Sequence, residues 1–79
     1  MEVYELDNDV IDYLEKRNLI TRYKKAKELL KKHEFEAVKF KKRQPKSAGI
    51  YYFRISRKYR ALGVFDGKDF IVTEISDHQ

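Results

Sequence analysis

Two arginines in the middle of the chain have side chains suited to binding phosphate. They are Arg54 and Arg60, near the start and at the end of the basic and aromatic run from Tyr52 to Arg60. A guanidinium group is always charged, and its planar fork of N–H donors can hold two phosphate oxygens at once. The surrounding sequence is typical of strands, and an arginine on a strand needs an anionic partner. The first chemistry that these residues suggest is therefore phosphate binding.

The charges of the chain are segregated along its length. Residues 1–15 carry six acids and no base, whereas residues 16–60 carry 17 bases and only three acids. Residues 61–79 carry one base and four acids, and the whole chain has a net charge of +5. A basic segment of this density attracts polyanions and supplies the sequence-independent part of nucleic-acid binding. RNA is the favoured partner, with a membrane surface or an acidic protein as the alternatives.

The length and composition predict one domain over residues 1–79 with a small core. A chain this short buries only about 60% of the surface that its unfolded form exposes. The sequence has no cysteine, which excludes disulfides, thiolate chemistry and Cys-type zinc sites. No apolar run approaches the length of a membrane span or a signal-peptide core. We therefore expect a soluble cytoplasmic protein that makes no contact with a membrane.

The first half of the chain predicts one strand followed by two helices. Residues 1–6 alternate between polar and apolar types, as in a strand. Asp7, Asn8 and Asp9 supply the side-chain acceptors and the acidic first turn that favour a helix start, and this helix should end near Arg17. Residues 19–30 then place apolar side chains at helical spacing, with most lysines and arginines on the other side.

After His33 the apolar period changes from helical to alternating. Strands are predicted around Val38 and Phe40, over 51–55, over 59–65 and over 70–75, with Asp66-Gly67 as a hairpin turn. The sequence does not decide which side of the strand over 59–65 faces the core, because the apolar residues Leu62 and Val64 lie on the same side as Arg60. The expected fold is α+β, with the N-terminal strand and both helices on one face of an antiparallel sheet that ends in a three-stranded meander.

This arrangement would leave the second face of the sheet open. If Phe53 points to the helices, then Tyr52 and Arg54 point away from them, because side chains alternate along a strand. Pairing with the preceding strand would bring Lys39 and Lys41 onto the same open face. The sequence therefore predicts a cationic concavity on the side of the sheet that the helices do not cover.

The C-terminal half of the chain also resembles a known protein family. The run from Arg54 to Arg60, then Phe65, the Asp66-Gly67 turn and the closing Glu74-Ile75-Ser76-Asp77-His78, are similar to RelE/ParE-superfamily toxins, especially the HigB branch. The resemblance covers about the last thirty residues, and the upstream part agrees only in the order of its elements. It implies the compact RelE-like fold and a toxin of a type II toxin–antitoxin pair. Such toxins cleave messenger RNA, often on the ribosome, and are neutralised by a cognate antitoxin.

The resemblance also implies roles for individual residues. Arg60 matches the arginine that holds the scissile phosphate, and Arg54 matches the arginine that opens the motif. Lys41, or its neighbours Lys39 and Lys42 in the basic strand, would add charge or act as the base. His78 or another lysine would be the acid, although the tyrosine that HigB-like members place before this histidine is missing. The expected RNA-binding residues are Lys39, Lys41, Lys42, Arg43, Arg57 and Lys58.

The expected reaction needs neither a metal nor a cofactor. Attack by the neighbouring 2′-hydroxyl of RNA requires cations to stabilise the phosphorane, a base for the hydroxyl proton and an acid for the leaving oxygen. The sequence has no carboxylate cluster typical of a magnesium site, and His33 and His78 lack partners at zinc-ligand spacing. The hypothesis is therefore a metal-independent endoribonuclease.

Each of these residue types has a simpler interpretation as well. Arg54 and Arg60 could be structural ion-pair partners of Glu74 or Asp77, and the lysines of residues 39–43 could be edge-strand charges that discourage aggregation. Tyr52 and Tyr59 could serve packing rather than base stacking. The cations of the second helix, Lys24, Lys25, Lys31 and Lys32, are most simply a solvated face. A non-enzymatic member of the same fold, either a gyrase-binding toxin or a degenerate binding protein, is the alternative function.

Overall fold

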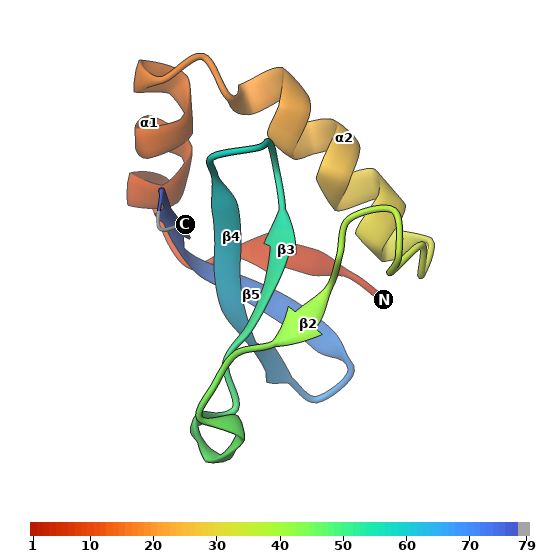
Figure 1. Cartoon of the computed structure of the whole chain (residues 1–79). Helices are drawn as coiled ribbons and strands as arrows, with labels where there is room; N and C mark the ends of the chain where they lie inside the picture. The colour runs from red at the N-terminus through yellow and green to blue at the C-terminus, as the bar shows by residue number, and fades with distance from the viewer. Residues whose placement is uncertain (78–79) are drawn as a thin grey trace.

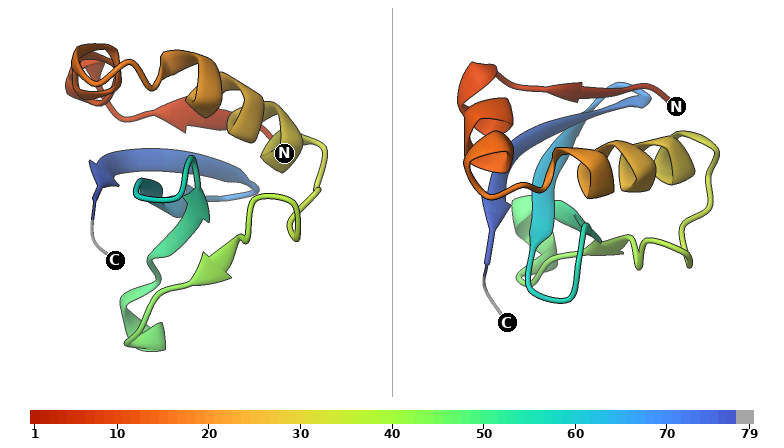
Figure 2. Two further views of the ribbon diagram at one scale, coloured as in Figure 1. Left: turned by 45° about the horizontal axis from the view of Figure 1, so that its top comes forward. Right: turned by 90° about the horizontal axis from the view of Figure 1, so that it is seen from above.

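Two helices lie on one face of a five-stranded sheet (Figure 1, Figure 2). The structure is a computed structural model that describes residues 1–77. Its elements are β1 (Val3–Glu5), α1 (Asn8–Lys16), α2 (Ile20–Lys31), β2 (Lys41–Lys42), the 3₁₀ helix η1 (Lys46–Ala48), β3 (Tyr51–Arg54), β4 (Arg60–Asp66) and β5 (Asp69–Ser76). The predicted α+β class is confirmed.

The strand order of the sheet is β1-β5-β4-β3-β2. Strands β2 to β5 pair antiparallel with their chain neighbours, and the hairpin turn at Gly67, with φ 63°, joins β4 to β5. Strand β1 instead pairs parallel with β5, with Val3 opposite Phe70. The sheet is therefore mixed, and the prediction of an entirely antiparallel sheet is wrong. Two helices and the meander separate β1 from β5 in sequence, so no local pattern reports the direction in which they pair.

Both helices follow the local signals in the sequence. The carboxylate of Asp7 accepts a hydrogen bond from the Asp9 N–H at 3.0 Å and caps α1. Helix α1 buries Val10 and Leu14 and has Arg17 as its C-terminal cap, which confirms the predicted boundaries. The chain then turns through Asn18 in the left-handed region, with φ 57°, and enters α2.

The hydrophobic core lies between the two helices and the sheet. Its fully buried side chains come from both layers: Leu14, Tyr23, Leu30, Phe53, Phe70 and Val72. The ring of Tyr23 on α2 stacks on Phe53 of β3, with centroids 6.2 Å apart. Because Phe53 faces the helices and is fully buried, its strand neighbours Tyr52 and Arg54 face the other side, as predicted.

A partly buried polar cluster connects β1 to α2. Glu5 Oε2 accepts hydrogen bonds from the Tyr23 hydroxyl at 2.5 Å and from Lys27 Nζ at 2.8 Å. Burial by itself would raise the pKa of the Glu5 carboxyl, but the hydrogen bonds from Lys27 and Tyr23 outweigh it and hold that pKa below its usual value. Burial and the Glu5 carboxylate together raise the pKa of the Tyr23 hydroxyl well above its usual value. The carboxylate is therefore the stable form of Glu5 in the folded protein.

The strand predicted through Val38 and Phe40 is not formed. Residues 35–39 make turns, in which the Phe40 N–H donates to the Phe35 carbonyl at 2.9 Å and Lys39 has φ 52°. These turns bring the ring of Phe40 into stacks with Phe35 and with Tyr51, at centroid distances of 5.4 and 5.3 Å. Aromatic packing thus favours turns over an extended segment, and regular pairing in β2 is limited to Lys41–Lys42.

A bulge between β4 and β5 determines which side chains of the two strands point toward the core. Leu62 pairs with Glu74 while Gly63 pairs with Val72, so Thr73 is the extra residue, and its hydroxyl donates to the Leu62 carbonyl at 3.3 Å. Gly63 lies so close to β5 that an added Cβ would overlap the Ile71 carbonyl oxygen and lie 2.8 Å from Phe70 Cζ. The bulge leaves Ile75 buried and Ser76 opposite Arg60.

Candidate nucleic-acid interface

The face of the sheet away from the helices presents matched polar residues on neighbouring strands. Tyr52 of β3 lies between Lys41 of β2 and Leu62 of β4 in the register of the sheet. Two pairs further along, Arg54 lies directly opposite Arg60. Since paired residues on neighbouring strands point to the same face, these side chains gather on the open side of the sheet.

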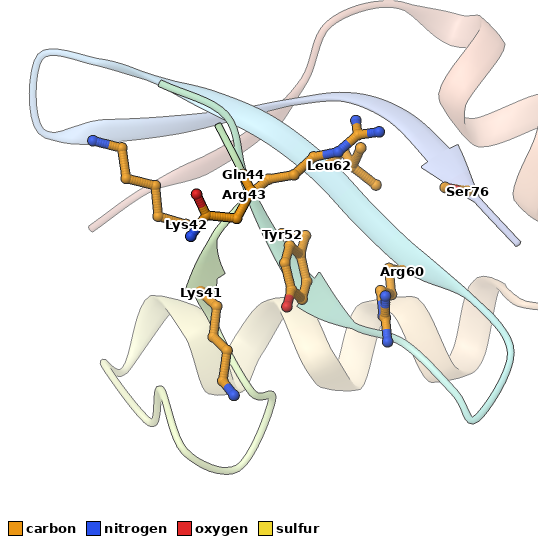
Figure 3. Close-up of a pocket in the computed structure, with 8 residues that line it drawn as sticks. All are labelled: Lys41, Lys42, Arg43, Gln44, Tyr52, Arg60, Leu62 and Ser76. Atoms are coloured by element: carbon orange, nitrogen blue, oxygen red, sulfur yellow. The ribbon is translucent and has the colours of Figure 1, made fainter. Parts of the chain in front are cut away.

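Two hollows on this face together form what we call the cationic hollow. They have volumes of about 570 and 210 Å³ and share Lys41, Tyr52 and Arg60. Lys42, Arg43, Gln44, Leu62 and Ser76 complete the lining of the larger one (Figure 3). Lys39, Arg54 and Arg57 complete the smaller one. No carboxylate lines either hollow in the described part of the chain, so the lining favours the binding of an anion.

Within the described residues, Arg54 and Arg60 have no acidic partner. Arg54 Nε donates to the Ser56 carbonyl at 3.2 Å, and the guanidinium carbon of Arg60 lies 5.1 Å from the centroid of the Tyr52 ring. Within residues 1–77, no ion pair joins either arginine to Glu74, Asp77 or any other carboxylate. The structural ion-pair interpretation is therefore wrong for this part of the chain. Two like charges face each other across neighbouring strands, and this arrangement is unfavourable unless an anion lies between them.

The two lysines of β2 diverge. Lys41 lies opposite Tyr52 and lines both hollows. Lys42 lies opposite Tyr51, and its ammonium is 5.6 Å from the centroid of the Tyr51 ring. Figure 3 shows the Lys42 side chain directed away from Tyr52 and Arg60. Lys42 therefore contributes to the outer rim of the larger hollow and does not converge with the arginines.

The other predicted residues are placed unequally. Lys39 reaches the smaller hollow from its left-handed turn, and Arg57 reaches it from the loop between β3 and β4. The side chain of Arg43 extends toward Leu62 along the larger hollow (Figure 3). Lys58 lines neither hollow, and its ammonium lies 5.5 Å from the centroid of the Tyr59 ring. His78, the predicted acid, lies outside the described residues.

The two tyrosines of the basic run have different surroundings. Tyr59 packs edge-on against Tyr13 of α1, with centroids 6.4 Å apart, which confirms the packing interpretation for this residue. Tyr52 lines both hollows and carries the Arg60 guanidinium over its ring. The sequence also offered packing as the interpretation of Tyr52, and it did not assign Gln44, Leu62 or Ser76 to the site. The sequence placed Tyr52 and Lys41 on the same open face, and the register of the sheet adds that they are directly paired.

The groups in the cationic hollow define its chemistry. Five cations surround Tyr52 in the smaller hollow, and this concentration of positive charge can stabilise a phosphate or a phosphorane. The proton-carrying groups there are ammonium, guanidinium and phenol groups, with no histidine or carboxylate among the described residues. Over residues 1–77 there is also no cluster of histidine, aspartate and glutamate side chains able to hold a metal ion. No helix in that range is both long and apolar enough to cross a membrane.

A scan against protein-family models finds no family that matches this chain, and a search of curated proteins finds no match either. Function must therefore be inferred from the residues and from their geometry.

Proposed function

We propose that this protein is a RelE-like endoribonuclease toxin that binds single-stranded messenger RNA in the cationic hollow and cleaves it there. The observation that supports this proposal most strongly is the pairing of Arg54 with Arg60 on neighbouring strands, with no carboxylate between them among the described residues. Two guanidinium groups at adjacent positions can grip the non-bridging oxygens of one phosphate. The ribosome and a cognate antitoxin are the proposed partners, in the cytoplasm.

The proposed reaction is attack of the RNA 2′-hydroxyl on its own 3′-phosphate. The new bond joins the 2′ oxygen to phosphorus, and the bond from phosphorus to the 5′ oxygen of the next nucleotide breaks. The products are a 2′,3′-cyclic phosphate and a 5′-hydroxyl end, so no water, metal or cofactor takes part. Arg54 and Arg60 would stabilise the charge that develops on the phosphate oxygens. Lys41, whose side chain lies on the same face, would take the 2′-hydroxyl proton as a neutral amine or add positive charge. Lys39 in the same hollow, or His78, would give the leaving 5′ oxygen the proton that makes it a hydroxyl.

The test uses purified protein and a single-stranded RNA in the presence of a metal chelator. Cleavage should persist in the chelator and leave 2′,3′-cyclic phosphate ends. The Arg54→Ala/Arg60→Ala double variant should form neither the 2′,3′-cyclic phosphate end nor the 5′-hydroxyl end. Activity that is lost in the chelator and restored by magnesium would contradict the mechanism.

A specific observation favours a second candidate, a protein that binds RNA or another partner without cleaving it. In the described residues the hollow offers no histidine or carboxylate to transfer protons. RNA that is bound but stays intact would favour this candidate. Intact RNA together with stalled gyrase complexes would favour the gyrase-binding form of the fold.

A further inference from the structure

Arg54 lines a second depression as well as the cationic hollow. This depression, which we call the α2 groove, has a volume of about 260 Å³ and lies between α2, the segment that follows it and the end of β3. Its cations are Arg22, Lys25 and Arg54, and its apolar lining includes Ala26, Leu29 and Val38. One residue at the end of β3 thus lines both depressions, so the α2 groove and the cationic hollow meet at Arg54.

We propose that the α2 groove is a second nucleotide subsite, which holds the RNA segment that continues from the cationic hollow. The inference rests on the proposed binding of RNA in that hollow. It assigns Arg22 and Lys25, which the sequence would place on an ordinary solvated helix face, to the binding of the same strand. The protein would therefore contact more of the RNA than the nucleotides beside the scissile phosphate.

The cations of α2 support this division of roles. Lys27 pairs with Glu5 at 2.8 Å, and Lys31 pairs with Glu2 at 3.5 Å and with Glu28 at 3.4 Å. Arg22 and Lys25 are exposed, and neither has an ion pair within residues 1–77. Lys27 and Lys31 are thus neutralised by neighbouring glutamates. Arg22 and Lys25 in the groove remain available to an anion.

The lining of the α2 groove matches the chemistry of a nucleotide. Its apolar floor offers a surface for the face of a base, and its three cations can contact the phosphates on either side. The backbone N–H of Arg54 donates to the Val38 carbonyl at 2.7 Å and fixes the end of β3 against the segment after α2. The groove is therefore built by α2, the segment after it and the end of β3, and this hydrogen bond holds the last two together.

The test compares the binding of a trinucleotide and of a dodecanucleotide RNA to two matched double variants. Arg22→Ala/Lys25→Ala removes the two groove cations, and Lys24→Ala/Lys68→Ala removes two exposed lysines that line none of the described hollows. The groove variant should bind the dodecanucleotide about tenfold more weakly, and the salt slope should become shallower by about 1.4 for two lost phosphate contacts. Trinucleotide binding, and every affinity of the control variant, should change by less than about twofold.

Three results would overturn the inference. Equal losses in the groove and control variants would mean that net charge alone matters. An unchanged dodecanucleotide affinity in the groove variant, with RNA still bound, would remove the subsite and leave the cationic hollow as the RNA site. Absence of RNA binding by the wild-type protein would refute the proposed function together with the subsite.

Polyglutamate serves as a second ligand. Loss of polyglutamate binding in the groove variant, with RNA binding intact, would assign the groove to an acidic protein partner. The Arg22→Gln/Lys25→Gln variant repeats the comparison if the alanine variant is unstable.

Discussion

At the scale of single residues, Arg54 and Arg60 occupy positions that stability alone does not explain. Like charges directly opposite each other on neighbouring strands are destabilising, by an amount within about 0.2–1 kcal/mol. No carboxylate in the described residues offsets this cost, and the ring of Tyr52 is the main contact of the Arg60 guanidinium. Such a pair is favourable only when a ligand supplies the negative charge.

The first prediction concerns Arg60. If Arg60 stabilises charge in the transition state, Arg60→Ala should lower the single-turnover cleavage rate by about 10²–10³. RNA affinity should fall far less, because other cations remain in the hollow. Thermal unfolding should be close to that of the wild-type protein, since no ion pair of Arg60 is lost among the described residues.

Two further variants make this prediction specific. Arg60→Lys keeps the charge but loses the planar fork, so partial rescue would indicate simple charge and no rescue would indicate bidentate binding. Arg17→Ala is the matched control, because Arg17 packs over the Tyr13 ring, away from both hollows. Wild-type cleavage by a folded Arg60→Ala protein would remove Arg60 from the site. An unfolded Arg60→Ala protein would make the residue structural.

At the scale of elements, the cluster of Glu5, Tyr23 and Lys27 ties the edge strand β1 to α2. The folded state lowers the pKa of Glu5, so the unfolded state binds a proton more readily than the folded state. The stability that this carboxylate contributes is therefore fully present above the unfolded pKa and is lost as the pH falls through the folded pKa. The pH range in which this stability is lost is therefore expected to be acidic.

The second prediction follows from this sign. Glu5→Gln should lower the free energy of unfolding at neutral pH by about 1.5–3 kcal/mol, the range for hydrogen bonds to a charged group. The difference from wild type should shrink as the pH falls, because protonation removes the charge of Glu5 in the wild-type protein as well. Urea unfolding across a pH series measures the difference in the free energy of unfolding. Glu15→Gln is the control, because Glu15 is exposed. A difference that is independent of pH would contradict the assignment.

The third prediction concerns the bulge between β4 and β5. An added methyl group at Gly63 would overlap the Ile71 carbonyl and press on the Phe70 ring, so the strands would have to separate. Gly63→Ala should destabilise the protein by at least about 1–3 kcal/mol, the usual cost of overpacking. Thermal unfolding measures the loss, and Ser47→Ala in the exposed η1 segment is the control. A Gly63→Ala protein as stable as wild type would show that β5 is not held so close.

The sequence predicted those elements whose signals are local. The Asp7 cap, the apolar spacing of α2 and the Asp66-Gly67 turn each specify their element within a few residues. It did not predict the parallel pairing of β1, the turns through Lys39 or the bulge at Thr73. All three depend on packing between residues far apart in the chain. The same division holds for the site. The sequence predicted the residue types and the open face that Tyr52 and Lys41 share, whereas the position of Arg60 beside them required the register.

At the scale of the whole molecule, the segregation of charge along the sequence becomes a segregation in space. Acidic residues of α1 and its cap gather near Glu74 of β5, where Asp7, Asp9 and Glu74 line one shallow hollow. The cationic hollow and the α2 groove are lined by bases without a carboxylate among the described residues. A polyanion approaching the protein is therefore drawn to one side of it.

The fourth prediction is a steep dependence of RNA binding on salt. If Arg54 and Arg60 together neutralise one phosphate of single-stranded RNA, and Lys41 and Arg57 neutralise one phosphate each, the log–log plot of affinity against salt should be linear with a slope of about −2. The α2 groove would make the slope steeper for longer RNA. Titration of a fluorescent RNA across a salt series measures the slope. Association that is insensitive to salt would exclude phosphate binding as the basis of the interaction.

The most direct test of the central claim is to induce the chain in a sensitive bacterial host and map RNA ends across the transcriptome. The wild-type chain should arrest growth and create new 5′-hydroxyl ends inside messenger RNAs. The Arg54→Ala/Arg60→Ala double variant, at the same protein level, should create none. Co-expression of a neutralising partner should relieve the arrest. An end profile identical to that of uninduced cells, from a folded and abundant wild-type protein, would contradict the proposal that this protein cleaves RNA.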